Sequence, residues 1–446
     1  MEKSLDRKLK AIHADPYGCK EFIIADAKDA DMAYGIGAPG KSPERHDGEV
    51  RFRTLAEYRE QIRQVVRQGV VDIMLMSAST SEILTIEERL FDDSPVTPAA
   101  RANDTTDIHL PRGGRYHLEP SRPFRTASID HLQCGHIDCR PEERRLGVDL
   151  GLYSITFNNQ VGPDVETLQR FKEFREEAER KGFRYFLEIF DPNMPDAVGP
   201  ELTPGFINDL IARTLAGVTK SARPLFLKMV YHGPRAMEEL VNYDPHLVVG
   251  VLGGAAGTTL DAFQLLYEAK KYGARAALFG RKINNAEHQL AFIQFLRLIA
   301  DGEIEPVEAV KAYHGVLQEL GIQPHRTLEE DLTLQTNVMS YSGSGTTISL
   351  PTSSGSSTSS TTSAAAASTA TTAAAGQKPS RKQQERQVAP KGSGSFNENA
   401  SNVNAKQQKA ERDSNTDAEA VPDFSRMTPQ ERLDYHLKRL NRMFGH

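Results

Sequence analysis

Leu225-Phe226-Leu227-Lys228-Met229-Val230-Tyr231 is an apolar run that a single lysine interrupts. A helix-periodic segment follows at 234–242, and a second apolar run occupies 247–252. Strands that are apolar throughout are typical of parallel sheets covered on both faces, and a parallel pair needs a crossover between its strands. This stretch therefore predicts a repeating unit of one strand and one helix in an α/β protein.

The same unit recurs along most of the chain. Strands are predicted at residues 22–25, 71–76, 125–129, 152–157, 185–190, 225–231, 247–252 and 274–279. Helices are predicted at residues 54–69, 164–181, 204–218, 234–242, 258–272, 285–301 and 306–320. Eight strand–helix units with short connections favour a (β/α)8 (TIM) barrel over residues 20–335, with a doubly wound open sheet as the alternative. The third strand has the weakest pattern, and it follows a polar insertion at 92–125.

The chain outside the barrel differs in composition. Residues 1–19 are expected to form an N-terminal extension, and residues 342–422 are rich in Ser, Thr, Gly, Ala and then charge. The latter have too little apolar surface to offset the entropy of ordering, so a disordered linker is expected. At 423–446 a capping box precedes an apolar stripe, which predicts a short amphipathic helix that needs a partner. The stripe consists of Leu433, Leu437, Leu440 and Phe444.

Composition excludes several classes of protein. A net charge of −6 argues against a general nucleic-acid or anionic-membrane surface. There is no run of eighteen apolar residues and no apolar signal segment, so neither a membrane span nor secretion is expected. Three cysteines suit a reduced cytoplasmic protein better than a disulfide framework.

Lys228 is the most informative polar residue, because a lysine is rarely buried unless it is paired or reactive. Burial disfavours the ammonium form, and the neutral amine is the form that attacks a carbonyl to give an imine. Glu188 interrupts the preceding apolar strand in the same way, and its carboxylate could orient the lysine or move protons. The alternative is a structural ion pair between the two. Their contact at the mouth of a pocket would favour a site, whereas a Lys228 that points into helix packing would exclude one.

Further candidates lie at the carboxyl ends of other strands, where the active sites of such barrels are found. Asp26 ends the first strand and is a second acid/base candidate, and Asn158 ends the fourth strand and is expected to contact substrate. Gly253-Gly254 and Gly280-Arg281 follow the last two strands, where backbone N–H groups and a guanidinium are suited to phosphate. Glycines placed there for steric reasons alone are the alternative.

A His-x2-Cys-x-His-x2-Cys cluster occurs at His131, Cys134, His136 and Cys139. Zinc accepts these ligand types, but the spacing matches no closed zinc-site pattern. We therefore expect a surface loop without metal. A metal-dependent lyase or hydrolase that uses this cluster is the weakest of the functional alternatives.

The lysine in the sixth strand, the Gly-Gly after the seventh and the Gly-Arg after the eighth resemble the class I aldolases. The archaeal-type fructose-bisphosphate aldolases and the tagatose-bisphosphate aldolases look like the nearest branch. The resemblance implies a Schiff base at Lys228, a catalytic-site glutamate at Glu188 and a strand-one acid at Asp26. It also implies a phosphate site at 253–254 and 280–281. The implied activity is a cofactor-free carbon–carbon lyase of carbohydrate metabolism that acts on a phosphorylated sugar or related carbonyl compound, and a homo-oligomer is expected.

Two features depart from that family. The archaeal-type enzymes have a tyrosine two residues beyond the position of Glu188, where this chain has Phe190, which cannot transfer protons. The 92–125 insertion has no counterpart. A non-catalytic barrel that acts as a binding or scaffold protein through its tethered helix is therefore the alternative function. That helix, at 428–444, is similar in layout to the encapsulation peptides that target enzymes to a bacterial microcompartment shell. Docking to another protein partner or self-association is the alternative.

Overall fold

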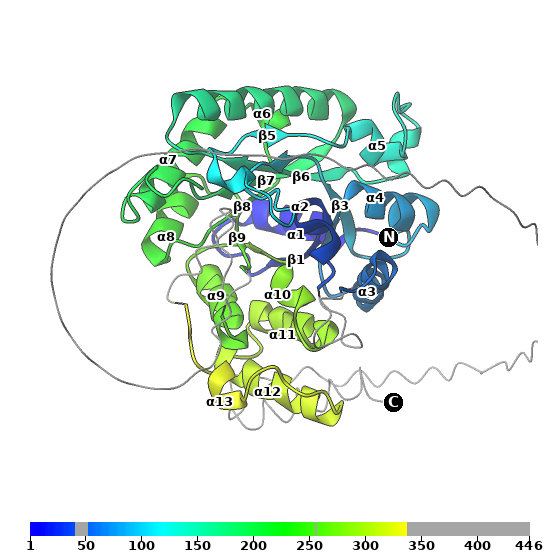
Figure 1. Ribbon diagram of the computed structural model, residues 1–446, viewed down its shortest axis with the longest axis vertical. Coiled ribbons are helices and arrows are strands. Elements are labelled where there is room, and N and C mark those ends of the chain that lie inside the picture. The colour runs from blue at the N-terminus through cyan, green and yellow to red at the C-terminus, as the bar shows by residue number, and fades with distance from the viewer. Residues whose placement is uncertain (41–51, 255–256, 337–446) are drawn as a thin grey trace, which may run out of the picture. The chain divides into compact units, whose positions relative to one another are not determined.

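The fold is a closed barrel of eight parallel strands (Figure 1), and the computed structural model describes residues 1–40, 52–254 and 257–336. The strands are β1 (Ile23–Lys28), β2 (Ile73–Met76), β3 (Thr97–Arg101), β6 (Leu150–Thr156), β7 (Arg184–Phe190), β8 (Leu227–Met229), β9 (Val249–Leu252) and β10 (Ala276–Phe279). They follow this order around the barrel, and β10 pairs with β1, with Ile23 opposite Ala276. This closure confirms the predicted barrel and excludes the open sheet.

The third strand is β3, so the prediction of a strand at 125–129 is wrong. A short strand β5 (Pro123–Phe124) pairs instead with β4 (Asp104–Thr105) in a separate antiparallel sheet, and Ile129–Cys134 forms helix α5. The sequence of β3, Thr-Pro-Ala-Ala-Arg, lacks the large apolar side chains that mark the other strands. The 92–125 segment is therefore partly barrel and only partly insertion.

Besides α5, the described residues contain twelve helices, which surround the barrel or close its end. They are α1 (Ser4–Ala14), α2 (Asp31–Tyr34), α3 (Leu55–Gln68), α4 (Ala78–Ser81), α6 (Val161–Lys181), α7 (Thr203–Leu215), α8 (Pro234–Tyr243), α9 (Thr259–Lys271), α10 (Arg281–Asn284), α11 (Gln289–Asp301), α12 (Pro306–Glu319) and α13 (Leu328–Asp331). Short helical turns are η1 (Gly35–Gly37), η2 (Glu82–Glu87, π-helical), η3 (Tyr116–Leu118), η4 (Glu143–Arg145) and η5 (Lys220–Ala222).

The predicted helices are present. Helix α3 begins after a capping box between Thr54 and Glu57 and ends at Gly69 in the left-handed conformation. The other predicted helices correspond to α6, α7, α8, α9, α11 and α12, with ends that differ by a few residues. The apolar periodicity of the sequence was therefore enough to locate these helices.

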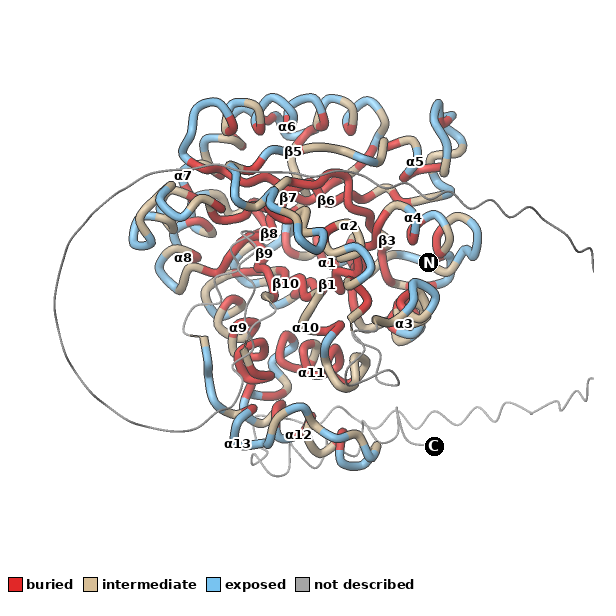
Figure 2. Tube along the Cα trace, in the orientation of Figure 1, coloured by how far each residue is buried: buried red, intermediate tan, exposed pale blue. Residues whose placement is uncertain are grey.

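The strands are buried almost throughout (Figure 2), and their side chains alternate between two layers. Outward side chains such as Leu227 and Val251 pack against the helices, whereas inward side chains such as Phe186 and Phe226 fill the barrel. The rings of Phe186 and Phe226 stack with centroids 4.6 Å apart. This alternation decides which polar side chains reach the interior.

Helix α1 closes the amino-terminal end of the barrel. Leu5, Leu9 and Ile12 belong to the same buried cluster as the inward side chains of the strands. Lys8 Nζ donates to Asp72 Oδ2 at 2.8 Å and to the Phe22 carbonyl at 2.9 Å, beside the starts of β2 and β1. Because this end is filled, the carboxyl ends of the strands are the end left for a site.

Two of the predicted regions lie C-terminal to the barrel. The predicted linker at 342–422 and the predicted amphipathic helix at 423–446 lie outside the described residues. Within the described ranges, none of the helices combines the length and the apolar character that crossing a membrane requires.

Candidate functional site

Lys228 and Glu188 both point into the barrel. Leu227 and Met229 belong to the outer layer, so the alternation sends Lys228 inward, and the register of β7 and β8 places it beside Glu188. Lys228 Nζ lies 2.5 Å from Glu188 Oε1, and both side chains are buried. Lys228 therefore does not point into the helix packing.

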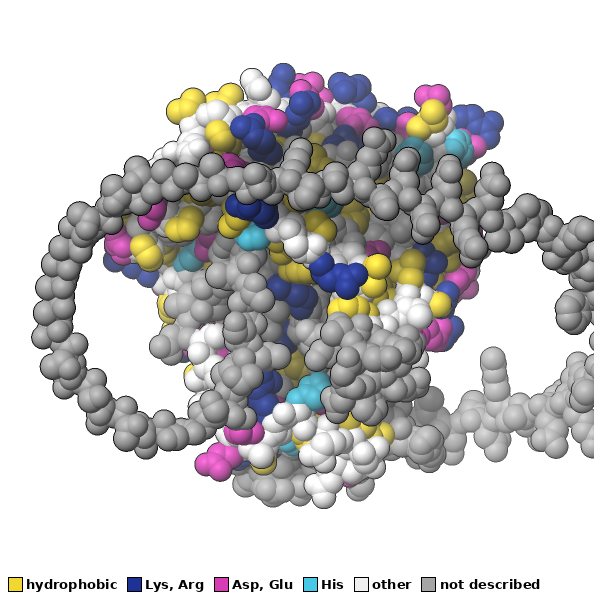
Figure 3. All heavy atoms as spheres, in the orientation of Figure 1, with side chains coloured by type: hydrophobic (Ala, Val, Ile, Leu, Met, Phe, Trp, Pro, Cys, Tyr) yellow, Lys and Arg dark blue, Asp and Glu magenta, His cyan; other side chains and the backbone are white. Residues whose placement is uncertain are grey.

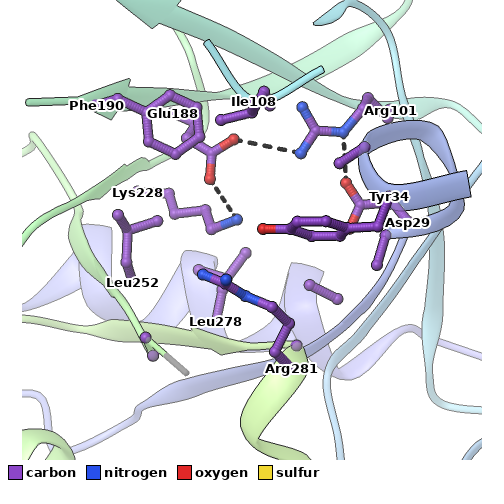
Figure 4. A pocket seen from close by; sticks show the side chains of 16 residues that line it. Asp29, Tyr34, Arg101, Ile108, Glu188, Phe190, Lys228, Leu252, Leu278 and Arg281 are labelled. Carbon is purple, nitrogen blue, oxygen red and sulfur yellow. Dashed lines mark hydrogen bonds and ion pairs between the residues drawn. The ribbon is translucent and has the colours of Figure 1, made fainter. Parts of the chain in front are cut away.

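Arg101, the last residue of β3, extends this pair into a row of buried charges (Figure 4). Its Nε lies 2.6 Å from Asp29 Oδ2, and its Nη2 lies 3.6 Å from Glu188 Oε2. The row alternates in sign from Asp29 through Arg101 and Glu188 to Lys228. Each buried charge thus has an opposite neighbour, which a buried ion requires.

Ser154 on β6 fixes the carboxylate of Glu188 from the side opposite Lys228. The Ser154 hydroxyl donates to Glu188 Oε2 at 2.6 Å and accepts from Arg101 Nη1 at 3.1 Å. Asn103 in turn holds the backbone of β6, because it accepts from Ser154 N at 2.6 Å and donates to Ser154 O at 2.8 Å. Glu188 is therefore held with Oε1 toward Lys228.

The electrostatic environment keeps Arg101 charged. Burial opposes the positive charge, but Asp29, Glu188 and Asp104 outweigh it and raise the pKa of the guanidinium. Asp104 itself lies further from the guanidinium, with Oδ1 3.8 Å from Arg101 Nη1. Burial raises the pKa of Asp104 from 3.8 to about 6, although Arg101 acts in the opposite direction.

We expect Asp104→Asn to stabilise the protein near pH 7.5 and to leave it unchanged near pH 4. The folded pKa of about 6 lies above the unfolded value of 3.8, so wild type is destabilised as pH rises through that window and this carboxyl ionises. The difference between the two pKa values corresponds to about 2–3 kcal/mol of lost stability above pH 6, and the uncharged amide of the Asp104→Asn variant does not incur this loss. Urea unfolding at the two pH values measures it, with Asp93→Asn at an exposed site as the control. An equal change at both pH values would contradict the assignment.

The charged row faces a cavity at the carboxyl end of the barrel. Of the predicted site residues, this cavity brings together Lys228, Glu188, Gly253, Gly254, Gly280 and Arg281. Its remaining lining includes Asp29, Tyr34, Arg101, Ile108, Phe190, Leu252 and Leu278. The contact between Lys228 and Glu188 thus occurs at a pocket that Gly254 and Arg281 also line, which is the arrangement that favours a site.

The wall formed by Gly253, Gly254, Gly280 and Arg281 combines close packing with positive charge. A Cβ on Gly253 would lie 2.1 Å from the Phe279 ring, and one on Gly280 would lie 2.7 Å from the Ala27 carbonyl. Steric need alone therefore accounts for those two glycines. Arg281 gives the wall its charge, and Lys and Arg side chains are visible near the centre of the face drawn in Figure 3. Such a wall suits an anionic ligand.

Asp26 does not line the cavity. It is fully buried, and its Oδ2 lies 3.0 Å from Lys28 Nζ, while the inward positions of β1 belong to Ala25 and Ala27. The next inward position along the chain is Asp29, which does line the cavity. The acid at the end of β1 that shares the cavity with Lys228 is therefore Asp29, the residue just after the strand and three residues beyond Asp26.

Asn158 does not line the cavity either. Its Oδ1 accepts from the Met194 backbone N–H at 3.0 Å, and its Nδ2 donates to Asn193 Oδ1 at 2.8 Å. Both ends of the amide are thus used to tie the loop after β6 to the loop after β7. The structure gives Asn158 a role in loop packing.

Tyr34 is a cavity residue that sequence reasoning missed. It is the last residue of α2, and in Figure 4 its hydroxyl is directed toward the end of Lys228. Phe190, by contrast, contributes an apolar ring to the lining, in a small cluster with Ile108 and Leu252. Tyr34 lies in a four-residue helix with no apolar periodicity, so the signal that could have found it is its position just after the polar end of β1.

Comparisons with known proteins add a likeness of fold. No protein-family model matches the chain, and no curated protein sequence matches it. The chain is similar to the solved structure of an archaeal fructose 1,6-bisphosphate aldolase, at 15% identity and a TM-score of 0.47 over 66% of this chain and 99% of that chain. It is also similar to a fructose-bisphosphate aldolase from Slackia heliotrinireducens, at 13% identity and a TM-score of 0.48 over 70% and 91% of the two chains.

A further similar structure is the N-acetylneuraminate lyase from Fusobacterium nucleatum, at 11% identity and a TM-score of 0.36 over 69% of this chain and 91% of that chain. The aldolase resemblance expected from the sequence thus recurs among the solved structures. The barrel assignment rests on the strand pairing of the chain itself.

Proposed function

We propose that the chain is a class I aldolase-type carbon–carbon lyase in which Lys228 forms a Schiff base with a carbonyl substrate. The observation that carries the proposal is the buried contact of 2.5 Å between Lys228 Nζ and Glu188 Oε1 inside the cavity. Active sites of such barrels lie at this carboxyl end. An ion pair that served packing alone would not need a cavity beside it or a second cation, Arg281, in the lining of that cavity.

Imine formation requires Lys228 to give up its extra proton, and Glu188 is the carboxylate that touches it. The lone pair on Nζ then attacks the carbonyl carbon while the carbonyl oxygen takes up a proton, which gives a carbinolamine. Loss of that oxygen as water leaves a protonated imine. Because Ser154 and Arg101 hold the far oxygen of Glu188, its near oxygen stays in place to exchange these protons.

Bond cleavage uses the protonated imine as the electron acceptor. The hydroxyl on the carbon beyond the scissile bond loses its proton, the carbon–carbon bond breaks, and its electron pair moves toward the imine nitrogen. An aldehyde leaves, the resulting enamine takes up a proton at carbon, and water releases the second product from Lys228. Glu188 and Asp29 are the carboxylates of the cavity lining that can serve these transfers, with Asp29 in the place expected for Asp26.

The charge of the cavity supports a phosphorylated substrate. Arg281 and the backbone of Gly253 and Gly254 form one wall, and a guanidinium can bind two phosphate oxygens at once. We therefore infer that the phosphate lies at this wall, with the carbonyl carbon toward Lys228. A sugar phosphate or related ketone phosphate fits this division of the cavity.

Tyr34 supplies the hydroxyl that the family resemblance places at the position of Phe190. We expect Tyr34→Phe to lower turnover by about 100-fold or more, because loss of a positioned proton donor costs roughly 10²- to 10⁴-fold. Adduct formation at Lys228 should persist, since the amine and Glu188 are untouched. Steady-state kinetics alongside borohydride trapping measures both effects, with Tyr17→Phe at an exposed tyrosine as the control. Unchanged turnover in Tyr34→Phe would remove this residue from the proton transfers.

Borohydride reduction tests the proposed function as a whole. It converts an imine into a stable amine, so a substrate that forms a Schiff base leaves a permanent mass increase on one lysine. The absence of any adduct on Lys228 across a panel of phosphorylated and unphosphorylated ketones and keto acids would refute the proposal.

A further inference from the structure

The loop from Gly135 to Leu146, between α5 and β6, has almost no apolar core of its own. Within it only Cys139 is buried, whereas Ile137 and Leu146 are exposed. Two backbone hydrogen bonds close the loop at its base, from Gly147 N to Gln133 O at 2.7 Å and from Val148 N to Leu132 O at 3.0 Å. A compact loop of this length without apolar burial needs another source of cohesion, and small core-poor units commonly use a disulfide or a metal.

Cys134, the last residue of α5, and several side chains of the loop are metal-ligand types. The sulfurs of Cys134 and Cys139 and a carboxylate oxygen of Glu143 all lie within 4.8 Å of one another. The exposed side chain of His136 lies beside this group rather than within it, with Nε2 3.8 Å from Glu143 Oε2, so its imidazole has to turn inward to become a fourth ligand. His131 does not take part, because its Nδ1 lies 2.8 Å from the Ser128 hydroxyl at the start of α5. The fold thus brings together the two cysteines of the sequence motif, places one of its two histidines beside them, and adds a glutamate that the motif did not include.

We propose that Cys134, Cys139, Glu143 and His136 form a structural zinc site. Two sulfurs, one imidazole nitrogen and one carboxylate oxygen are a ligand set that tetrahedral zinc accepts. Binding replaces the two thiol protons with Zn²⁺, so two protons are released and no electron is transferred. Arg140, whose Nη2 lies 2.6 Å from Glu143 Oε1, offsets the negative charge that remains on the four-ligand site.

The zinc site lies away from the cavity. Helix α5 contacts the carboxyl end of α6, where Lys181 Nζ lies 2.9 Å from Asp130 and Gln133 donates to the Lys181 carbonyl. That end of α6 leads into the start of β7, and the loop itself leads into the start of β6, so the zinc site is at the amino-terminal end of the barrel. Residues at this end of such barrels serve stability, and the metal would pin the loop rather than touch substrate.

Metal analysis of the full chain tests the zinc site. Protein is produced with added zinc, purified under reducing conditions, and its zinc content per chain is measured by plasma mass spectrometry. We expect one equivalent in wild type and in Cys19→Ser, the matched control at the one cysteine outside the proposed site, and background levels in Cys134→Ser and Cys139→Ser. Glu143→Gln should weaken zinc binding by about tenfold or more. Circular dichroism confirms that each variant is folded.

A second measurement follows the loop itself. Removal of zinc by a chelator should speed tryptic cleavage after the loop arginines Arg144 and Arg145, and addition of Zn²⁺ should restore protection. Three outcomes would overturn the proposal: wild type without stoichiometric zinc, a Cys134–Cys139 disulfide in its place, or zinc retained when both cysteines are serine. None of these outcomes bears on Lys228, so the zinc site and the proposed lyase activity stand or fall separately.

Discussion

Borohydride reduction in the presence of dihydroxyacetone phosphate is expected to leave a covalent adduct on Lys228 and to abolish turnover. The Lys228→Met variant should take up no adduct at all. It should also lose turnover by roughly 10⁴- to 10⁶-fold, as enzymes do when their covalent nucleophile is removed. Intact mass and peptide mapping locate the adduct, and a coupled assay of aldehyde release measures turnover.

The sharpest control is another lysine. Burial lowers the pKa of Lys282 to about 8, so a fraction of this amine is neutral near pH 7 and could react in place of Lys228. Lys282 Nζ donates to the Gly257 carbonyl at 2.8 Å and does not line the cavity. Lys282→Met should therefore keep both the adduct and the turnover. An adduct that moves to Lys282, or that disappears only in Lys282→Met, would contradict the assignment of Lys228.

The second large effect concerns stability. Arg101→Met leaves Asp29 without its 2.6 Å partner and removes one of the cations beside Glu188. Leaving a buried charge without its partner costs about 3–5 kcal/mol, a large share of the roughly 5–15 kcal/mol that stabilises a folded domain. We expect the variant to unfold at markedly lower urea concentration, or to be recovered poorly, with turnover lost as Glu188 reorients.

The matched control is Arg63→Met, the same substitution at the surface. Arg63 also forms two ion pairs, at 2.6 Å to Glu88 and 3.1 Å to Glu60, but these lie near solvent. Exposed pairs contribute about 0–1 kcal/mol each, so this variant should change stability little. Urea unfolding followed by circular dichroism compares the two variants. If Arg101→Met costs no more than Arg63→Met, the buried row is not a source of stability.

The sequence allowed the barrel to be predicted because seven of its strands are apolar runs and its helices carry caps and an apolar stripe. The third strand escaped because its residues, apart from Arg101, are small or proline, and burial there needs no large side chain. A spacing argument could have found it: nearly fifty residues separate β2 from the strand predicted at 125–129, which is too long for one short connection.

The error on the third strand carried over into the site. Because β3 was predicted at the wrong residues, Arg101 was not recognised as a polar residue at the carboxyl end of a strand. Lys228 and Glu188 were recognised because their strands were predicted correctly. Asp29 points into the barrel and Asp26 does not, and only the register of β1 with its neighbours distinguishes the two residues. The charged sequence at the end of β1 does not show which of its positions face inward. Tyr34 depends on a short helix after β1 that has no periodic signal.

The pairing of β1 with β10 has a consequence for synthesis. Ile23 finds its partner Ala276 only after some 250 further residues have been made, and Arg297 Nη1, which bonds the Phe22 carbonyl at 2.9 Å, emerges later still. Until then the first strand keeps one edge unpaired, and contacts so distant in sequence form slowly. During synthesis the partial barrel is therefore an open sheet with two unpaired edges, which can pair with other chains until β10 is made.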